Sequence, residues 1–303
     1  CLCHLKEGAP QTFYEALQTI YLYFIVSECF DSYQVRSLGN GLDNSLYRFY
    51  RHDLESGAFT KEELREFLSY FLMQWSAIGN YWGQPFYLGG TDADGKTRYN
   101  ELSGEILAVY DELGIYNPKI QLKINFSTPE WLLHQALEMV RHGHNSMVFC
   151  CEPGMIDAVM RYGATLEEAQ NMDIRGCYET GVRGKEVSTI TAYINAPKAV
   201  EYALYNGYDR TICRQNGLMT GETSDLPAFE DFYRAVIRQW DHLIDTAIEV
   251  SRAYDPYLGL INPSNLYSAT IEDSLECGTD AYQSGVRFNN SALLNCGFAC
   301  LVD

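Results

Sequence analysis

The feature that most constrains this chain is a regular alternation of helix-capping signals with short apolar runs. A Thr or Ser followed closely by Glu or Asp is typical of a capped helix N-terminus, and such segments occur at Thr12, Thr60, Ser127, Thr165 and Thr270. The runs between them are apolar or alternating and are bounded by Gly, Asn and Pro, which predicts strands at 85–90, 119–126, 146–151 and 188–195. This succession predicts an α/β fold with much parallel pairing, in which loops at strand ends hold the chemistry. A barrel is one natural closure of such a sheet.

The longest linker-like stretch runs over 207–229. A separate piece beyond it would hold one long helix, from Glu230 to Tyr254, and little sheet, which cannot enclose a core by itself. We therefore expect one catalytic domain over residues 1–303.

Charge and hydropathy exclude two classes of partner. The formal net charge is −18, and no basic cluster interrupts the acidity, so a nucleic-acid backbone is a poor ligand. The longest apolar segment, 13–30, contains Glu15 and Glu28, so we expect no membrane span. The chain begins without Met and without the layout of a signal peptide, so we expect an internal piece of a longer protein.

The ten cysteines lie mostly inside predicted helices and strands, which favours reduced thiols and therefore a cytoplasmic protein. The closely spaced cysteines that could serve as metal ligands are Cys1 with Cys3, the pair at 150–151, and Cys296 with Cys300. They form no zinc quartet with one another or with the six histidines, so we predict no metal site and treat most of these thiols as small buried side chains.

Cys177 differs from the others because it lies in a polar, glycine-punctuated loop, RGCYETGVRGKE. Gly176 and Gly181 allow backbone conformations that are closed to other residues, so the Cys177 thiol and the Glu179 carboxylate could be presented together into a cavity. A lone loop cysteine is by itself only a candidate catalytic residue, because such a thiol is more often inert.

Three segments of the chain resemble the glycyl radical enzymes of the pyruvate formate-lyase-like superfamily. GCYETG resembles that family's GCVE loop, YLGGTDADGKTRYNELS at 87–103 resembles its GGxDxxGxxxxNELS segment, and the Arg287–Asn290 run resembles its RYNN motif. The resemblance implies part of a ten-stranded β/α barrel of two half-sheets surrounded by helices. It also implies that an N-terminal helical portion and the C-terminal glycyl radical segment lie outside this chain.

The resemblance assigns Cys177 as the residue that becomes a thiyl radical and Glu179 as the acid/base. It implies that the glycyl radical is installed by a radical S-adenosylmethionine activase, and that the full-length protein is a homodimer acting on a small-molecule substrate. Asp31 and Ser32 loosely occupy the polar positions of the substrate pocket in ECFDSYQVRSLGNGLD, although polar residues at a helix end are usually caps.

A single cysteine followed by Glu favours the lyase branch of the family, which includes dehydratases, decarboxylases and C–N or C–S lyases. Thr180 and Gly181 resemble the arylacetate decarboxylase and hydroxyproline dehydratase subgroup, whereas Tyr178 and Arg183 depart from it. Two alternatives remain open: acyl transfer of the formate C-acetyltransferase type, for which the adjacent cysteines at 150–151 are the tempting site, and an inactive scaffold that keeps the fold.

Overall fold

A computed structural model describes residues 2–30, 41–78, 85–176, 179–188 and 191–302. The chain forms two compact bodies, one made of residues 1–185 with 266–275 and the other of residues 186–265 with 276–303. That both bodies belong to one catalytic domain stays a prediction.

The first body is built around a parallel three-stranded sheet in the order β1-β2-β3. Its strands are β1 (Phe86–Gly89), β2 (Ile120–Ile124), β3 (Met147–Cys151) and the separate pair β4 (Asp173–Arg175) and β5 (Glu179–Gly181). Its helices are α1 (Leu2–Leu5), α2 (Phe13–Phe30), α3 (Leu42–Ser56), α4 (Lys61–Ser76), α5 (Glu101–Leu113), α6 (Glu130–Arg141), α7 (Glu152–Arg161) and α8 (Leu166–Gln170), with most of α11 (Asn265–Ser268) and α12 (Glu272–Cys277).

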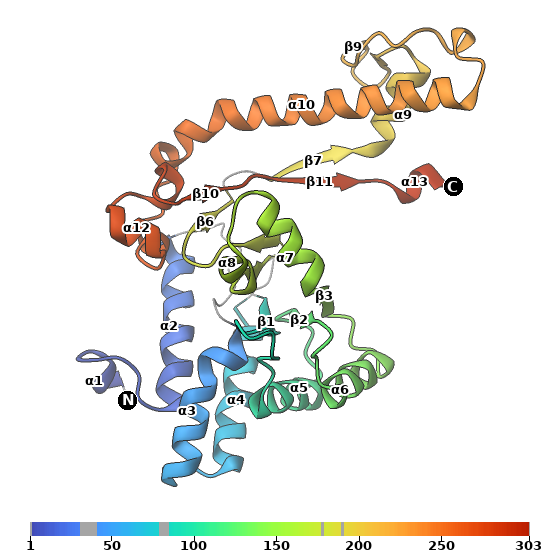
Figure 1. The fold of residues 1–303 in the computed structure, drawn as a ribbon. Coiled ribbons are helices and arrows are strands. Elements are labelled where there is room, and N and C mark those ends of the chain that lie inside the picture. The colour runs from blue at the N-terminus through green and yellow to red at the C-terminus, as the bar shows by residue number, and fades with distance from the viewer. Residues whose placement is uncertain (1, 31–40, 79–84, 177–178, 189–190, 303) are drawn as a thin grey trace. The chain divides into compact units, whose positions relative to one another are not determined.

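One face of this sheet is fully apolar. Phe86, Leu88, Ile120 and Leu122 point into the main core, where helices α2 to α6 supply the other side chains. In Figure 1 helices α3 to α6 gather on one side of β1–β3, and α7 and α8 lie on the other side. The second face of the sheet is therefore not part of this core, and it carries polar residues such as Gln121 and Lys123.

Three of the five predicted helix starts are capped as expected. Thr60 and Thr165 form capping boxes, and the hydroxyl of Thr12 accepts a hydrogen bond of 3.2 Å from the backbone of Glu15. The prediction for Ser127 is wrong, because α6 begins only at Glu130 and Ser127 instead donates to the Asn125 side chain.

The cap predicted at Thr270 is also wrong. Its hydroxyl donates to the carbonyl oxygen of Tyr267 at 2.7 Å, so it closes the turn behind it instead of capping α12. A Thr-x-x-Asp pattern cannot distinguish these two uses of one hydroxyl, since both satisfy a backbone group at a turn.

The second body contains two parallel strand pairs. These are β6 (Glu186–Val187) with β10 (Phe288–Asn289), and β7 (Thr191–Asn195) with β11 (Ala292–Cys296). Its remaining elements are α9 (Ala196–Leu204), β8 (Tyr208–Asp209), β9 (Arg214–Gln215), the short 3₁₀ turns η1 (Thr223–Asp225) and η2 (Ala281–Gln283), α10 (Phe229–Ile261) and α13 (Ala299–Val302). No helix in the described ranges is both long enough and apolar enough to cross a membrane.

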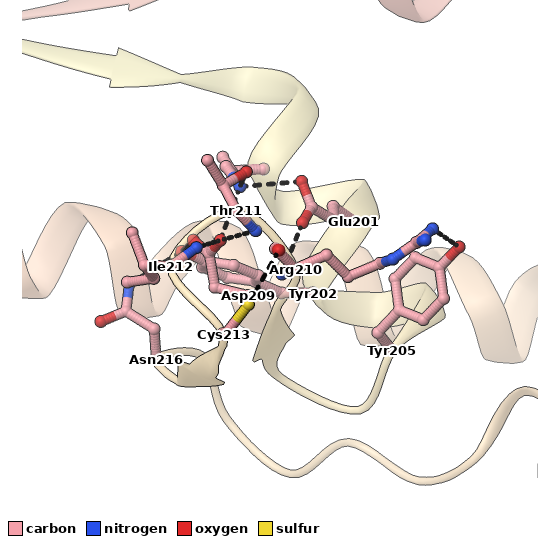
Figure 2. A network of polar contacts seen from close by, with 10 residues as sticks. Glu201, Tyr202, Tyr205, Asp209, Arg210, Thr211, Ile212, Cys213 and Asn216 are labelled. Carbon is pink, nitrogen blue, oxygen red and sulfur yellow. Dashed lines mark hydrogen bonds and ion pairs between the residues drawn. The ribbon is translucent and has the colours of Figure 1, made fainter.

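The stretch predicted as linker-like, 207–229, instead begins with an ordered hairpin of β8 and β9. Asp209 holds it, because its carboxylate accepts from the Tyr202 hydroxyl at 2.7 Å, from Lys198, and from the backbone of Thr211 and Ile212 (Figure 2). The hydrogen bonds from Tyr202 and Lys198 hold the pKa of Asp209 well below its usual range. Polar composition misled the prediction because the polar groups here bond to one another.

Candidate active-site hairpin

The loop predicted to carry the chemistry lies at the end of an antiparallel hairpin. Strands β4 and β5 pair with Asp173 opposite Gly181 and Arg175 opposite Glu179. Gly176 follows β4 with a φ of 56°, the left-handed region that glycine enters without strain, so its predicted conformational role is confirmed. Cys177 follows Gly176 in the sequence but lies outside the described residues, as do Asp31 and Ser32.

Glu179 opens β5 directly after the turn and is half-buried. Its pairing with Arg175 places it one residue beyond the undescribed pair 177–178, on the return arm of the hairpin. The backbone of Glu179 is therefore held by strand pairing and not by a free loop.

Gly181 is needed for a reason that differs from the prediction. Its backbone does not enter the left-handed region, but a Cβ added there would lie 1.7 Å from Nη2 of Arg175. The Arg175 guanidinium crosses the strand at this point and donates to the carbonyl oxygen of Thr180 at 3.3 Å. Glycine at 181 therefore provides room for a side chain, whereas glycine at 176 provides a backbone conformation.

Three side chains from the second face of the sheet hold the hairpin. The hydroxyl of Tyr87 donates to Oδ1 of Asp173 at 2.9 Å, and Nζ of Lys123 donates to the carbonyl oxygen of Met172 at 2.6 Å. Nε2 of Gln121 donates to the carbonyl oxygen of Gly176 at 3.0 Å. The base of the hairpin and the residue next to Cys177 are thus both fastened to β1 and β2.

Lys123 is an unusual sheet residue because its side chain is only 1% exposed. Burial lowers the pKa of Lys123 to about 8, and the nearby carboxylates of Glu152 and Asp173 oppose that shift. The ammonium group also lies 4.4 Å from the centre of the Tyr87 ring, a cation–π distance. Burial likewise raises the pKa of Asp173, although its hydrogen bond from Tyr87 acts in the opposite sense.

Glu152 is buried at the start of α7, next to Lys123. Its carboxylate accepts from the backbone and hydroxyl of Thr91, at 2.9 and 2.6 Å, and from the side chain of Asn125 at 2.5 Å. These donors lie just beyond β1 and β2, so the carboxyl ends of the three parallel strands are joined by one polar cluster. Such a cluster favours a single arrangement of the strand ends below the hairpin.

Asp43 closes the cluster on the helical side. It is fully buried and accepts from the backbone of Gly89 at 3.0 Å and from the hydroxyl of Ser103 at 2.6 Å. Burial raises the pKa of Asp43 to about 6, which the hydrogen bonds partly offset.

Sequence reasoning missed Tyr87, Gln121, Lys123, Glu152 and Asp43 as parts of the site. The available signal was the alternation of KIQLKINF, in which the polar members share one face of a strand. That alternation does not distinguish a solvated face from a buried one, because the pattern is the same in both cases.

The adjacent cysteines have different surroundings. Cys150 is buried on the hairpin side of the sheet among Tyr87 and Ile174, and burial raises its pKa to about 11, whereas Cys151 is exposed. A buried thiol of raised pKa stays protonated and packs as a small apolar group. No group of three or more His, Cys, Asp or Glu residues in the described ranges could hold a metal ion.

Comparison with known proteins finds relatives that match nearly the whole chain. Trans-4-hydroxy-L-proline dehydratase of Clostridioides difficile is 28% identical over 97% of this chain, and the 4-hydroxyphenylacetate decarboxylase glycyl radical subunit of the same species is 26% identical over 99%. The chain spans 39% and 37% of the length of these two relatives.

Solved structures agree with the sequence relatives. A glycyl radical enzyme from Archaeoglobus fulgidus has a TM-score of 0.86 at 26% identity, covering 96% of this chain and 39% of its own. The substrate-bound hydroxyproline dehydratase from Clostridioides difficile has a TM-score of 0.82 at 27% identity, covering 94% of this chain and 38% of its own. These similarities confirm the predicted fold class, α/β and part of the barrel of this family. Because residues 2–303 match the family described as pyruvate formate lyase-like, the chain belongs to that family.

Proposed function

We propose that this chain is the thiyl-bearing part of a glycyl radical lyase that removes a small leaving group from a small organic substrate. The observation that carries the proposal is the anchored β4–β5 hairpin, whose return arm begins with Glu179 and whose two arms are joined in the sequence by the segment that contains Cys177. The relatives include dehydratases, a decarboxylase and sulfite-lyases, which supports elimination or decarboxylation as the reaction class.

The residues present fit the radical chemistry of the family. When present, the glycyl radical supplies a carbon-centred radical that accepts the hydrogen atom of a thiol. Cys177 gives up that hydrogen atom, and its sulfur then takes a hydrogen atom from a substrate C–H bond. After the substrate has lost its leaving group, Cys177 returns a hydrogen atom to the product radical and is again a thiyl radical. It then takes back the hydrogen atom that it first gave up to the glycyl position, so the thiol and the glycyl radical are both regenerated in each turnover.

Glu179 would move the proton that accompanies the loss of the leaving group. In a dehydration, a protonated carboxyl gives its proton to the departing hydroxyl, and the carboxylate then accepts a proton from the substrate. Its pairing with Arg175 holds the backbone of Glu179 in β5, which supports this role. Asp31 and Ser32 stay proposed as substrate contacts.

We further propose that the full-length protein is cytoplasmic, forms a homodimer, and is activated by a radical S-adenosylmethionine enzyme. Acyl transfer through the adjacent cysteines is a weaker candidate, because Cys150 is packed between the sheet and the hairpin and burial raises its pKa. An inactive scaffold is a weaker candidate because the hairpin keeps both a turn cysteine and a following carboxylate.

The test is made on the activated full-length protein under anoxia, with the dehydration of hydroxyproline and the decarboxylation of hydroxyarylacetates as first reactions. Cys177→Ser should form the glycyl radical by electron paramagnetic resonance and turn nothing over, since an O–H bond resists homolysis far more than S–H. Cys150→Ala and Cys151→Ala are the controls and should keep substantial turnover. Turnover by Cys177→Ser, with loss in Cys151→Ala, would transfer the role to the adjacent pair.

A further inference from the structure

The hairpin is bound to the sheet at both ends of β4. Lys123 donates to the carbonyl oxygen of Met172, the residue before β4, and Gln121 donates to the carbonyl oxygen of Gly176, the residue after it. Both donors belong to β2 and are two residues apart, so they project from the same face of one strand. Their spacing along β2 therefore fixes the direction of the β4 arm as well as its distance from the sheet.

The strand that carries these donors is itself immobilised. Gln121 and Lys123 are 0% and 1% exposed, and β2 lies between β1 and β3 in the sheet. The carbonyl oxygen of Lys123 accepts from the hydroxyl of Tyr99 at 3.1 Å, and the residues alternating with these donors point into the apolar core. A displacement of either donor would have to move packed core residues, which makes β2 a stiff support.

Transfer of a hydrogen atom requires the donor and acceptor atoms to be close, and a misplacement of about 1 Å can cost on the order of 100-fold in rate. Gly176 is the residue next to Cys177, so its carbonyl group is the nearest described backbone group to the proposed radical carrier. A donor fixed to that carbonyl controls how far the turn can drift from its productive place.

We infer that Gln121 and Lys123 are positioning residues for the radical relay: they hold the two ends of β4 so that the Cys177 turn keeps a fixed place. This inference rests on the proposed function. Neither residue is assigned contact with the substrate. Gln121 acts at the turn and Lys123 at the base, so loss of the Gln121 bond should disturb hydrogen transfer more than it disturbs folding.

The decisive variant is Gln121→Met, which keeps an unbranched side chain of similar length and removes the donor. The matched control is Gln135→Met on α6, because Gln135 also donates through Nε2 to a glycine carbonyl oxygen, that of Gly104, at the same 3.0 Å. Both variants are made in the activated full-length protein. Lys123→Met is made as well, but the outcome of the test does not depend on whether that variant folds.

Two readouts separate positioning from general stability. The first is turnover together with the yield of glycyl radical by electron paramagnetic resonance. The second is the rate at which the radical signal changes in D₂O, because a thiol that exchanges its hydrogen with solvent delivers deuterium to the glycyl carbon only by reversible transfer through Cys177.

For Gln121→Met we expect about 10- to 100-fold lower turnover and slower deuterium incorporation, with unchanged radical yield and little change in KM. Gln135→Met should keep both rates. Parental turnover and exchange in Gln121→Met would overturn the inference, as would equal losses in both glutamine variants with equally lowered thermal midpoints. Cys177→Ser distinguishes the two levels: if it is inactive while Gln121→Met is unaffected, only the inference fails; if Cys177→Ser is also active, the proposed function fails.

Discussion

Gly89, the last residue of β1, offers a direct test of how tightly the strand ends are packed below the hairpin. Its φ is +76°, and a Cβ at this place would lie 2.3 Å from the ring of Tyr99. Gly95 has nearly the same φ, +77°, with nothing within 4 Å of its added Cβ, so it is a matched control. Comparing Gly89→Ala with Gly95→Ala thus separates backbone strain from crowding.

The expected magnitudes follow from the surroundings. Gly95→Ala should cost about 1–2 kcal/mol, since only the left-handed backbone penalty applies. Gly89→Ala has the same penalty, and it must also displace a Tyr99 ring that is 7% exposed, at about 1–3 kcal/mol. Displacing the ring also breaks the bond from the Tyr99 hydroxyl to the Lys123 carbonyl oxygen, worth about 1 kcal/mol. The free energy of unfolding should therefore fall by about 3–6 kcal/mol in Gly89→Ala.

Equilibrium urea unfolding of the full-length protein, followed by tryptophan fluorescence, measures both variants. The ring centroids of Trp75 and Phe86 lie 4.8 Å apart in the same core, so the fluorescence of Trp75 reports on this body. If the two variants differ by less than about 1 kcal/mol, the Tyr99 ring yields freely and the argument for a rigid strand end is wrong.

Three further predictions concern single side chains. Burial lowers the pKa of Lys123 to about 8 in the folded state, so the folded state binds fewer protons than the unfolded chain between pH 8 and 10.5. The free energy of unfolding of the parent should therefore rise with pH, relative to that of Lys123→Met, by about 3 kcal/mol over this range. Urea titrations at several pH values measure this difference. Asp209→Asn should weaken the β8–β9 hairpin and raise amide hydrogen exchange over 205–216, since an amide replaces the carboxylate that accepts from Tyr202 and Lys198; unchanged exchange would contradict this (Figure 2). Thr60→Ala should lower the stability of the first body by about 1 kcal/mol through loss of the α4 cap, whereas Thr60→Ser should keep it.

The candidate site could be predicted only in part from the sequence. The left-handed conformation of Gly176 was predicted correctly, because a glycine directly before a chain reversal commonly adopts a positive φ. The role of Gly181 was predicted wrongly, since its neighbour Arg175 lies six residues earlier in the chain and meets it only through strand pairing. The side chains that hold the hairpin were missed because Tyr87 and Gln121 lie more than fifty residues before the groups they bind.

The sequence by itself determined the period of each element and therefore the α/β class. The alternation of 119–126 specified a strand, and the boxes at Thr60 and Thr165 specified helix starts, because both signals act between residues close in the chain. Only the tertiary structure decided that the polar face of β2 is buried, with Gln121 and Lys123 bonded to the hairpin. The physical reason is that a polar side chain can satisfy its hydrogen bonds either with water or with a distant backbone carbonyl, and the local sequence pattern is the same in both cases.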